Sequence, residues 1–156
     1  MDGSPKIISL LGDLLASELA AINTYFVNAR LLENWGFPPL AKRAYDESMG
    51  EMRHAQNLID RIIYLDAMPN LQKMGRVRAG STVGEQFEQE LDLEKATRSA
   101  LVTGIELCTA EGDDGTRLLL EPMLAEGEAT IDWFETQLGL IESLGEAAYL
   151  AQQIRE

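Results

Sequence analysis

The chain has 156 residues with 26 acidic and 13 basic side chains, so its formal net charge is −13, and leucine, alanine and glutamate are abundant. A chain of this length can form one domain with one core, and its few aromatic and β-branched residues favour helix over strand, so we predict an all-α fold. The negative charge would repel a phosphate backbone and an anionic membrane surface, which argues against nucleic acid and membrane as partners.

The N-terminal segment has no basic region of the kind that begins a signal peptide, and Asp13 and Glu18 interrupt the apolar run that follows. We therefore expect neither a signal peptide nor a membrane span. Cys108 is the only cysteine, so no intrachain disulfide can form. A cytoplasmic location is the expectation that follows.

Helix signals divide the chain into four long helices and a short fifth one. Ser4 and Pro5 supply a cap and a first-turn proline for the first helix, and Pro38 opens the second. Gly112 and Gly145 are the stop signals after the third and fourth helices. The expected helices span about 5–34, 38–66, 82–111, 115–143 and 146–153.

The segment 67–82 has no helical period and contains one proline and two glycines, so we predict a long connection there. A crossover of about 15 residues lets the second and third helices run parallel, which is the topology of ferritin-like bundles. We therefore predict that 1–156 form a single ferritin-like four-helix bundle with one long crossover and a short fifth C-terminal helix.

Three carboxylates lie on the apolar stripes of the expected helices, where an ionised group is costly unless it is paired or binds a metal. They are Glu18, Glu51 and Glu94, one on each of the first three helices. His54, the only histidine, follows Glu51 at i+3, so both side chains project from one face. Carboxylate and imidazole groups together suit iron, manganese or zinc. The pattern predicts a metal site of these four residues.

Each of these residues also has a metal-free explanation when it is taken alone. A glutamate at the edge of a stripe can extend to water, and a lone histidine is usually a hydrogen-bonded core residue. Three carboxylates and the only histidine at the same height of three helices are much harder to explain in this way. We therefore prefer the metal site.

A second apolar row, the outer row, contains Tyr45, Met49 and Met52 on the second helix, off its core face. With Leu19 and Phe26 of the first helix, this row predicts a subunit interface. Methionines in such a row more often pack than bind a ligand, and the pattern alone does not indicate a haem.

Six segments carry motifs of one known family. They are ELAAINTYF at 18–26, WG at 35–36, YDESMGEMRHA at 45–55, PNLQ at 69–72, IDWFETQ at 131–137 and YLAQQI at 149–154. With these segments the chain resembles the bacterioferritins, and the resemblance covers essentially its whole length.

The resemblance implies a cytoplasmic cage of 24 subunits that stores a ferric mineral. It also implies b-type haem shared across each two-fold interface, non-haem iron at a di-iron ferroxidase centre in each bundle, and a ferredoxin-type reductant as partner. Met52 matches the axial haem ligand, and Tyr25 and Trp133 match aromatics near the metal site. The matched iron ligands are Glu18, Glu51, His54 and Glu94. The positions that match the haem pocket are Leu19, Ile22, Asn23, Phe26, Tyr45 and Met49.

The resemblance breaks on the fourth helix, where the family has a second Glu-x-x-His pair and this chain has Gly127 and Thr130. Glycine has no side chain, and a neutral hydroxyl is a poor iron ligand. Glu126 and Glu128 are adjacent, but each is rotated by about 100° around the helix, so we expect that neither replaces a lost ligand, because this would need a local distortion. With four of six ligands left, the subunit should oxidise iron slowly or not at all when alone.

We therefore expect an iron-storage subunit that binds haem, holds an incomplete di-iron site and co-assembles with a second, ferroxidase-competent bacterioferritin subunit. In an alternative interpretation, the reduced centre is still an active ferroxidase with help from Glu126 or Glu128. A third interpretation is a purely structural shell subunit, which would bind neither iron nor haem. The small DNA-protecting relatives of ferritin are disfavoured by the net charge and by the fifth helix.

Overall fold

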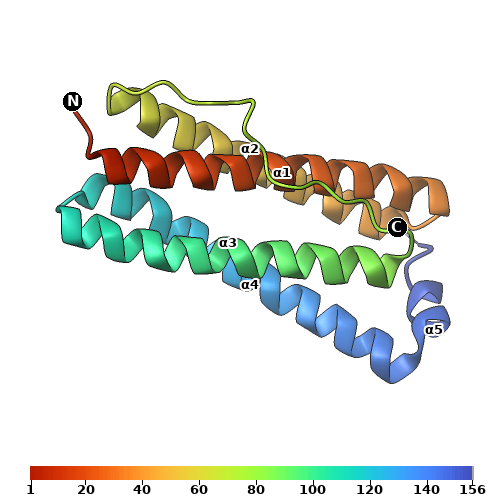
Figure 1. The fold of residues 1–156 in the computed structure, drawn as a ribbon. Helices are drawn as coiled ribbons and strands as arrows, with labels where there is room; N and C mark the ends of the chain where they lie inside the picture. Colours follow the sequence, from red (N-terminus) through yellow and green to blue (C-terminus); the bar gives the residue numbers. More distant parts are fainter. Residues whose placement is uncertain (156) are drawn as a thin grey trace.

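The computed structural model describes residues 1–155 as an all-α bundle (Figure 1). Its helices are α1 (Pro5–Trp35), α2 (Pro38–Tyr64), α3 (Val83–Glu111), α4 (Asp114–Leu144) and α5 (Glu146–Ala151). α1 packs along α2 and α3 packs along α4, while α5 turns away at the end of α4. The predicted ferritin-like four-helix bundle with a short fifth helix is confirmed.

Local sequence signals set most of the helix ends. The side chains of Ser4 and Thr82 accept backbone N–H groups in the first turns of α1 and α3. Gly112 ends α3 in the left-handed conformation, which glycine adopts without a side-chain clash. α2 ends at Tyr64 rather than near 66, because Asp66 has a positive φ of 58° that no right-handed helix contains. The fifth helix is also shorter than expected and ends at Ala151 rather than near 153.

The crossover between α2 and α3 has no regular secondary structure and runs along α1 (Figure 1). The N–H of Gly75 donates to the carbonyl of Ala16 at 3.2 Å, and Lys73 forms a 2.7 Å ion pair with Asp13. These contacts hold the crossover on the first helix. Because the chain returns along the bundle in this way, α2 and α3 run in the same direction.

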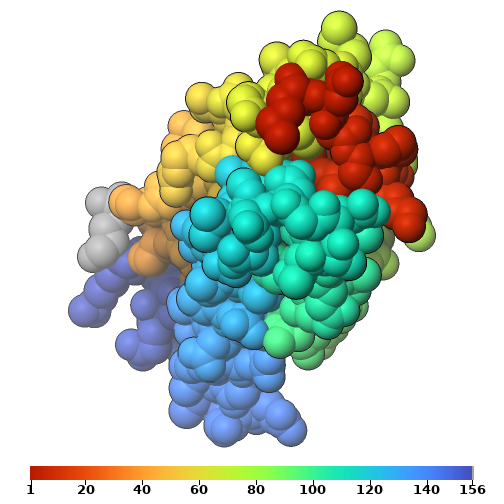
Figure 2. All heavy atoms as spheres, turned by 90° about the vertical axis from the view of Figure 1, so that its left-hand side faces the viewer, coloured from red at the N-terminus to blue at the C-terminus, as the bar shows by residue number. Residues whose placement is uncertain are grey.

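The core consists of two apolar clusters along the bundle axis. One contains Leu58 and Leu120, and the other contains Phe87 and Phe134. The helix turn between α3 and α4 closes the end of the bundle nearer the first cluster, beside the N-terminus (Figure 2). The buried side chains of Glu18, Glu51 and Glu94 fall where one cluster gives way to the other along each helix. The fold therefore places a layer of carboxylates in the middle of the core.

Within the described residues, α1 is the one helix that is long and apolar enough to cross a membrane. Of its most apolar stretch, 56% is buried against the rest of the bundle. Leu11, Leu14 and Leu15 are among the buried residues of the first cluster. The apolar character of α1 is accounted for by its place in the core.

Candidate metal centre

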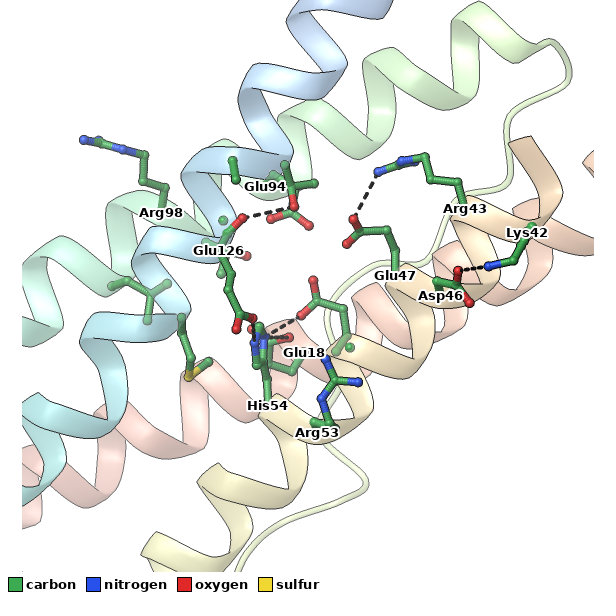
Figure 3. Close-up of a pocket in the computed structure, with 18 of the residues that line it drawn as sticks. Glu18, Lys42, Arg43, Asp46, Glu47, Arg53, His54, Glu94, Arg98 and Glu126 are labelled. Atoms are coloured by element: carbon green, nitrogen blue, oxygen red, sulfur yellow. Dashed lines mark hydrogen bonds and ion pairs between the residues drawn. The ribbon is translucent and has the colours of Figure 1, made fainter. Parts of the chain in front are cut away.

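A cavity of about 480 Å³ lies between α2 and α4 at mid-height of the bundle, and we call it the central cavity (Figure 3). α2 and α4 make few contacts with each other, so their side of the bundle is open. The residues of its wall that matter here are Glu18, Glu51, His54, Glu94, Glu126 and Gly127. All four predicted metal ligands therefore line one cavity.

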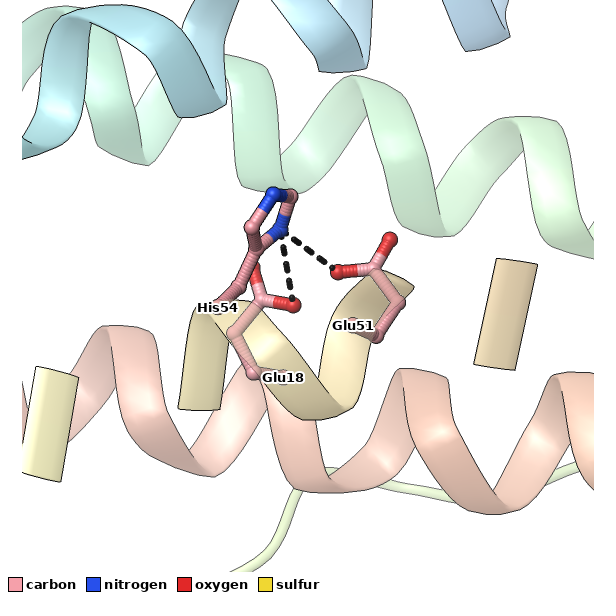
Figure 4. Close-up of side chains that lie close together, drawn as sticks. All are labelled: Glu18, Glu51 and His54. Carbon is pink, nitrogen blue, oxygen red and sulfur yellow. Dashed lines mark hydrogen bonds and ion pairs between the residues drawn. The ribbon is translucent and has the colours of Figure 1, made fainter. Parts of the chain in front are cut away.

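Three of the four predicted ligands converge in a close cluster, Glu18 from α1 and the Glu51–His54 pair from α2 (Figure 4). Nδ1 of His54 lies 3.1 Å from Oε2 of Glu51 and 3.8 Å from Oε2 of Glu18. One ligand atom from each residue lies within 4.8 Å of the other two. A single cation can contact all three at this spacing.

The pKa values of the cluster are shifted by burial and by the close approach of two carboxylates to one imidazole. Burial raises the pKa of Glu51 from its usual 4.5 to about 8, and the nearby Glu18 carboxylate adds to the effect. Burial lowers the pKa of His54, but hydrogen bonding and charge from Glu18 and Glu51 outweigh it and raise that pKa to about 11. Oε2 of Glu18 is buried without a hydrogen-bond partner. Such an oxygen is costly, and a cation between the carboxylates would satisfy it.

Glu94 on α3 lines the same cavity but stands apart from the close cluster. The buried hydroxyl of Tyr25 donates to its Oε1 at 2.6 Å. Burial raises the pKa of Glu94 to about 8, and repulsion from Glu51 contributes in the same direction. The structure therefore brings Tyr25 and Glu94 together beside the cluster.

The wall that α4 supplies carries no ligand at Gly127 or Thr130. A Cβ atom added at position 127 would lie 3.8 Å from Oε2 of Glu94, so a side chain here would point at the site. The hydroxyl of Thr130 donates to the carbonyl of Glu126 at 3.1 Å, which directs it back to its own helix. Both positions line the cavity without placing a ligand atom in it.

Glu126 reaches the central cavity and contacts His54, but it is not one of the three residues whose ligand atoms converge. Its Oε2 lies 2.5 Å from Nε2 of His54, while α4 continues as a helix to Leu144 (Figure 3). The glutamate side chain is long enough to reach His54 across the open side of the bundle although the residue is exposed. Glu128 does not reach the site, because it forms a 2.9 Å ion pair with Arg98.

Trp133 is the predicted aromatic that the structure places away from the ligands. It does not line the central cavity. The guanidinium of Arg43 lies 3.6 Å from its ring centroid, and Nη2 of Arg43 lies 3.4 Å from Oε1 of Glu47. Trp133 therefore helps to hold a cation–carboxylate pair at the cavity wall. The i, i+4 spacing of Arg43 and Glu47 is the sequence signal that could have indicated this pair.

Glu90 is a buried carboxylate that the sequence analysis missed. Its side chain is 1% exposed, and Nδ2 of Asn28 donates to its Oε1 at 2.8 Å. Burial raises its pKa to about 7, against the opposing effect of the Asn28 hydrogen bond. Its position one helical turn before Glu94 on the same stripe was the available signal.

Comparisons with known proteins agree with the fold. The family model described as ferritin-like domain matches residues 8–144. The chain is 47% identical to a bacterioferritin of Mycobacterium leprae over 97% of this chain and 96% of the relative. It is 45% identical to bacterioferritin BfrA of Mycobacterium tuberculosis with the same coverage, and 43% identical to a bacterioferritin of Streptomyces coelicolor over 100% of this chain and 93% of the relative. The chain belongs to the bacterioferritin family. It is therefore a member of a family of iron-storage proteins.

In this bacterioferritin-family chain, the outer row is partly exposed to solvent. Met52 is 50% exposed, and the rings of Phe26 and Tyr45, both exposed, lie 6.3 Å apart. Nδ2 of Asn23 donates to the sulfur of Met74 at 2.9 Å, so the crossover borders the row. The other three positions matched to the haem pocket are Ile22, which is buried, and Leu19 and Met49, which are half-buried. One chain supplies a face here rather than an enclosed pocket.

Proposed function

We propose that the chain is an iron-storage subunit of a bacterioferritin cage of 24 subunits, which takes up iron as cargo at one cation site formed by Glu18, Glu51 and His54. The observation that carries this proposal is the convergence of three ligand atoms within 4.8 Å of one another, beside a Glu18 oxygen that is buried without a hydrogen-bond partner. A divalent cation would neutralise the like charges of the two carboxylates and accept the imidazole lone pair.

The same site is too poor in ligands for rapid Fe(II) oxidation. Two irons that together reduce dioxygen must be held about 3.5 to 4 Å apart by carboxylates that offset their mutual repulsion. Beside Glu94 the second position lacks a carboxylate at Gly127 and an imidazole at Thr130. Glu94 is instead engaged by the Tyr25 hydroxyl. The chain is therefore a subunit with a degenerate ferroxidase centre.

The outer row fits one half of a haem pocket that a second copy of the chain would complete. Its exposed aromatic rings offer apolar walls, and the exposed Met52 offers a thioether, which is a known axial ligand of haem iron. A two-fold axis through this face would present Met52 from both copies. Haem b bound there would supply electron transfer to stored iron. Phe26 and Tyr45 would exclude water from its faces.

A subunit with an intact haem face and an incomplete iron centre is explained by co-assembly. In such a cage, a second bacterioferritin subunit with both Glu-x-x-His pairs oxidises iron, and this chain contributes storage volume and haem. A ferredoxin-type reductant and a cytoplasmic location belong to the same proposal. Native mass spectrometry of the cage from its own cells tests the composition. A cage that contains this chain alone contradicts co-assembly.

The central proposal is tested by titrating the purified homomeric cage with Fe(II) without oxygen and then measuring oxygen consumption. We expect one Fe(II) per chain, loss of that binding in Glu51→Ala, and slow oxygen consumption. No binding at all would favour a purely structural shell subunit.

An active ferroxidase is the second candidate, because Glu126 contributes a carboxylate at the cavity. In that case two irons would bind per chain, and oxygen would be consumed rapidly. The same titration therefore separates the two candidates.

A further inference from the structure

The two ring nitrogens of His54 have different partners, and the proposed function uses only one of them. Nδ1 faces the carboxylates of Glu18 and Glu51 (Figure 4). Nε2 lies 2.5 Å from Oε2 of Glu126, which approaches from α4 (Figure 3). The imidazole ring therefore stands between the ligand cluster and a fourth carboxylate.

This arrangement decides which nitrogen can bind a cation. A metal-bound imidazole uses the lone pair of one nitrogen and carries its proton on the other. Because Glu126 is an acceptor beside Nε2, the proton belongs on Nε2 and the lone pair on Nδ1 faces Glu18 and Glu51. A carboxylate on the far nitrogen of a ligating histidine fixes the ring orientation and makes the ligand more basic.

Glu126 is placed to act on His54 and not to join the ligand cluster. The side chains of Glu18 and Glu51 are 3% and 9% exposed, while that of Glu126 is 59% exposed. Glu126 lies at the mouth of the cavity, on the opposite edge of the ring. Glu128 is paired with Arg98, so the contact with His54 is specific to one of the two acidic residues that flank Gly127.

We propose that Glu126 is a positioning residue for His54: its carboxylate accepts the Nε2–H, fixes the tautomer that presents Nδ1 to the cation, and links α4 to the site. This proposal rests on the proposed cation site. It gives α4 a function in cation binding although Gly127 and Thr130 supply no ligand. The link also crosses the side of the bundle where α2 and α4 otherwise make few contacts.

Zinc binding to the intact cage tests the proposal without iron oxidation. The variants are Glu126→Ala, Glu126→Gln and the control Glu128→Ala, which removes a similarly exposed carboxylate that is paired with Arg98. We expect Glu126→Ala to weaken zinc binding by about 10- to 100-fold in a chelator competition. Glu126→Gln should keep most of the affinity, because its amide oxygen still accepts the Nε2–H. Glu128→Ala should bind zinc as the parent does.

A second readout follows the tautomer directly. His54 is the only histidine, so solid-state NMR of the zinc-loaded cage with ¹⁵N-labelled imidazole reports one residue. The parent and Glu126→Gln should show one species, with zinc on Nδ1 and a hydrogen-bonded proton on Nε2. In Glu126→Ala the Nε2 signal should lose its hydrogen-bond shift. A merely structural role for Glu126 would leave this signal unchanged.

Two results would overturn the positioning role. If Glu126→Ala binds zinc like the parent with the same Nε2 signal, Glu126 has no effect on His54. If Glu126→Gln loses as much affinity as Glu126→Ala, and X-ray absorption shows one oxygen fewer around zinc, Glu126 is itself a ligand.

Other results bear on the proposed cation site alone. If the parent binds no zinc, or binds it equally well in Glu51→Ala, that site is wrong. Should Glu126→Ala fail to assemble, Glu126→Asp, which is one methylene shorter, replaces it and should be weaker than Glu126→Gln.

Discussion

The hydroxyl of Tyr25 on α1 donates a 2.6 Å hydrogen bond to Oε1 of Glu94 on α3, and both side chains are buried. This bond opposes the effect of burial and lowers the pKa of Glu94, although burial still dominates. It also joins two helices at the height of the central cavity. The bond is therefore a structural restraint on the carboxylate nearest to Gly127.

Removing this restraint should cost stability at the cavity. Tyr25→Phe leaves the buried Glu94 oxygen without its donor, so we expect the free energy of unfolding to fall by about 1 to 2 kcal/mol at neutral pH. Urea unfolding at pH 7 measures the loss. Tyr149→Phe is the matched control, because Tyr149 donates a 2.6 Å bond to Gln137, which does not line the cavity as Glu94 does. An unchanged Tyr25→Phe would mean that the bond contributes nothing.

The metal-free cage should become less stable as pH rises from about 4.5 to 8. Burial raises the pKa of Glu51 and Glu94 to about 8 and that of Glu90 to about 7. Each group binds its proton more tightly in the folded chain than in the unfolded one. The contribution of these protonated carboxyl groups to the free energy of unfolding is therefore fully present below pH 4.5. It is lost as pH rises through 7 and 8. Above its usual pKa of 6.5, His54 also lowers the stability of the folded chain as pH rises, because its pKa is raised to about 11.

Thermal unfolding at pH 5, 6, 7 and 8 in a chelator measures this dependence. Added zinc should recover stability at pH 8 more than at pH 5, because protonated carboxylates do not bind a cation. A midpoint that rises between pH 5 and pH 8 in the chelator would contradict the assignment of raised pKa values.

Glu90 offers a way to remove one of these groups without touching the proposed ligands. In Glu90→Gln, Asn28 can still donate to the side-chain oxygen, while no charge forms above pH 7. We expect little change in the free energy of unfolding at pH 5 and a gain on the order of 2 kcal/mol at pH 8. Glu88→Gln, exposed on the same helix, is the control. If Glu90→Gln changes the free energy of unfolding equally at both pH values, ionisation of the buried Glu90 does not destabilise the folded chain.

The fold was predictable because its determinants are local. Stripes of leucine and alanine, a proline after Ser4 and glycines at positions such as 112 are each readable from the sequence alone. The end of α2 was harder, because the positive φ of Asp66 follows from how the chain turns into the crossover. A periodic pattern fixes the existence of a helix better than its last residue.

Of the site, only those features that follow from helix geometry could be predicted from the sequence. The placement of Glu18, Glu51 and His54 on core faces follows from a 3.6-residue period. The approach of Glu126 does not, because it depends on a gap between α2 and α4 and on the length of a side chain that leaves the helix toward solvent. Sequence spacing gives the direction of a Cα–Cβ bond, but it does not give the width of a cavity.

The haem proposal makes a prediction that one absorption spectrum can check. Met52→Ala should abolish the bands of bis-methionine haem in the recombinant cage, with haem in the parent at up to about one per two chains. The cage should stay assembled, because the Met52 side chain is half exposed and lies outside the core. Met68→Ala, on the crossover and 88% exposed, is the control. Haem content that is equal in Met52→Ala and the parent would show that Met52 is not the ligand.

Restoring the missing pair on α4 should restore rapid Fe(II) oxidation. In Gly127→Glu with Thr130→His, the side chain of the new glutamate begins at a Cβ atom 3.8 Å from Oε2 of Glu94, and apart from its chain neighbours and its own helix backbone no other atom lies within 4 Å. The new histidine follows it at i+3, on the wall of the cavity that faces His54. Six ligands from four helices would then surround two irons.

The cost of these substitutions should be small enough for assembly. Replacing glycine within α4 contributes up to about 1 kcal/mol through helix propensity, which offsets part of the cost of burying new polar groups before iron binds. Gly127→Ala with Thr130→Ala is the control, since it gains at least as much helix propensity without adding ligands. Stopped-flow oxidation at about two Fe(II) per chain is the assay, and the control should remain as slow as the parent.

The outcomes of this assay distinguish two reasons for an inactive centre. If the double variant assembles and binds two irons but stays slow, the loss of ligands is not what limits this subunit. If the parent is already fast, the centre is not degenerate. Glu126, which already lies 2.5 Å from His54 across the cavity, would then be the residue that compensates for Gly127. If the double variant oxidises Fe(II) rapidly while the parent and the alanine control oxidise it slowly, the missing ligands are the cause of slow oxidation in the parent. This follows because the three cages differ only at the two positions on α4.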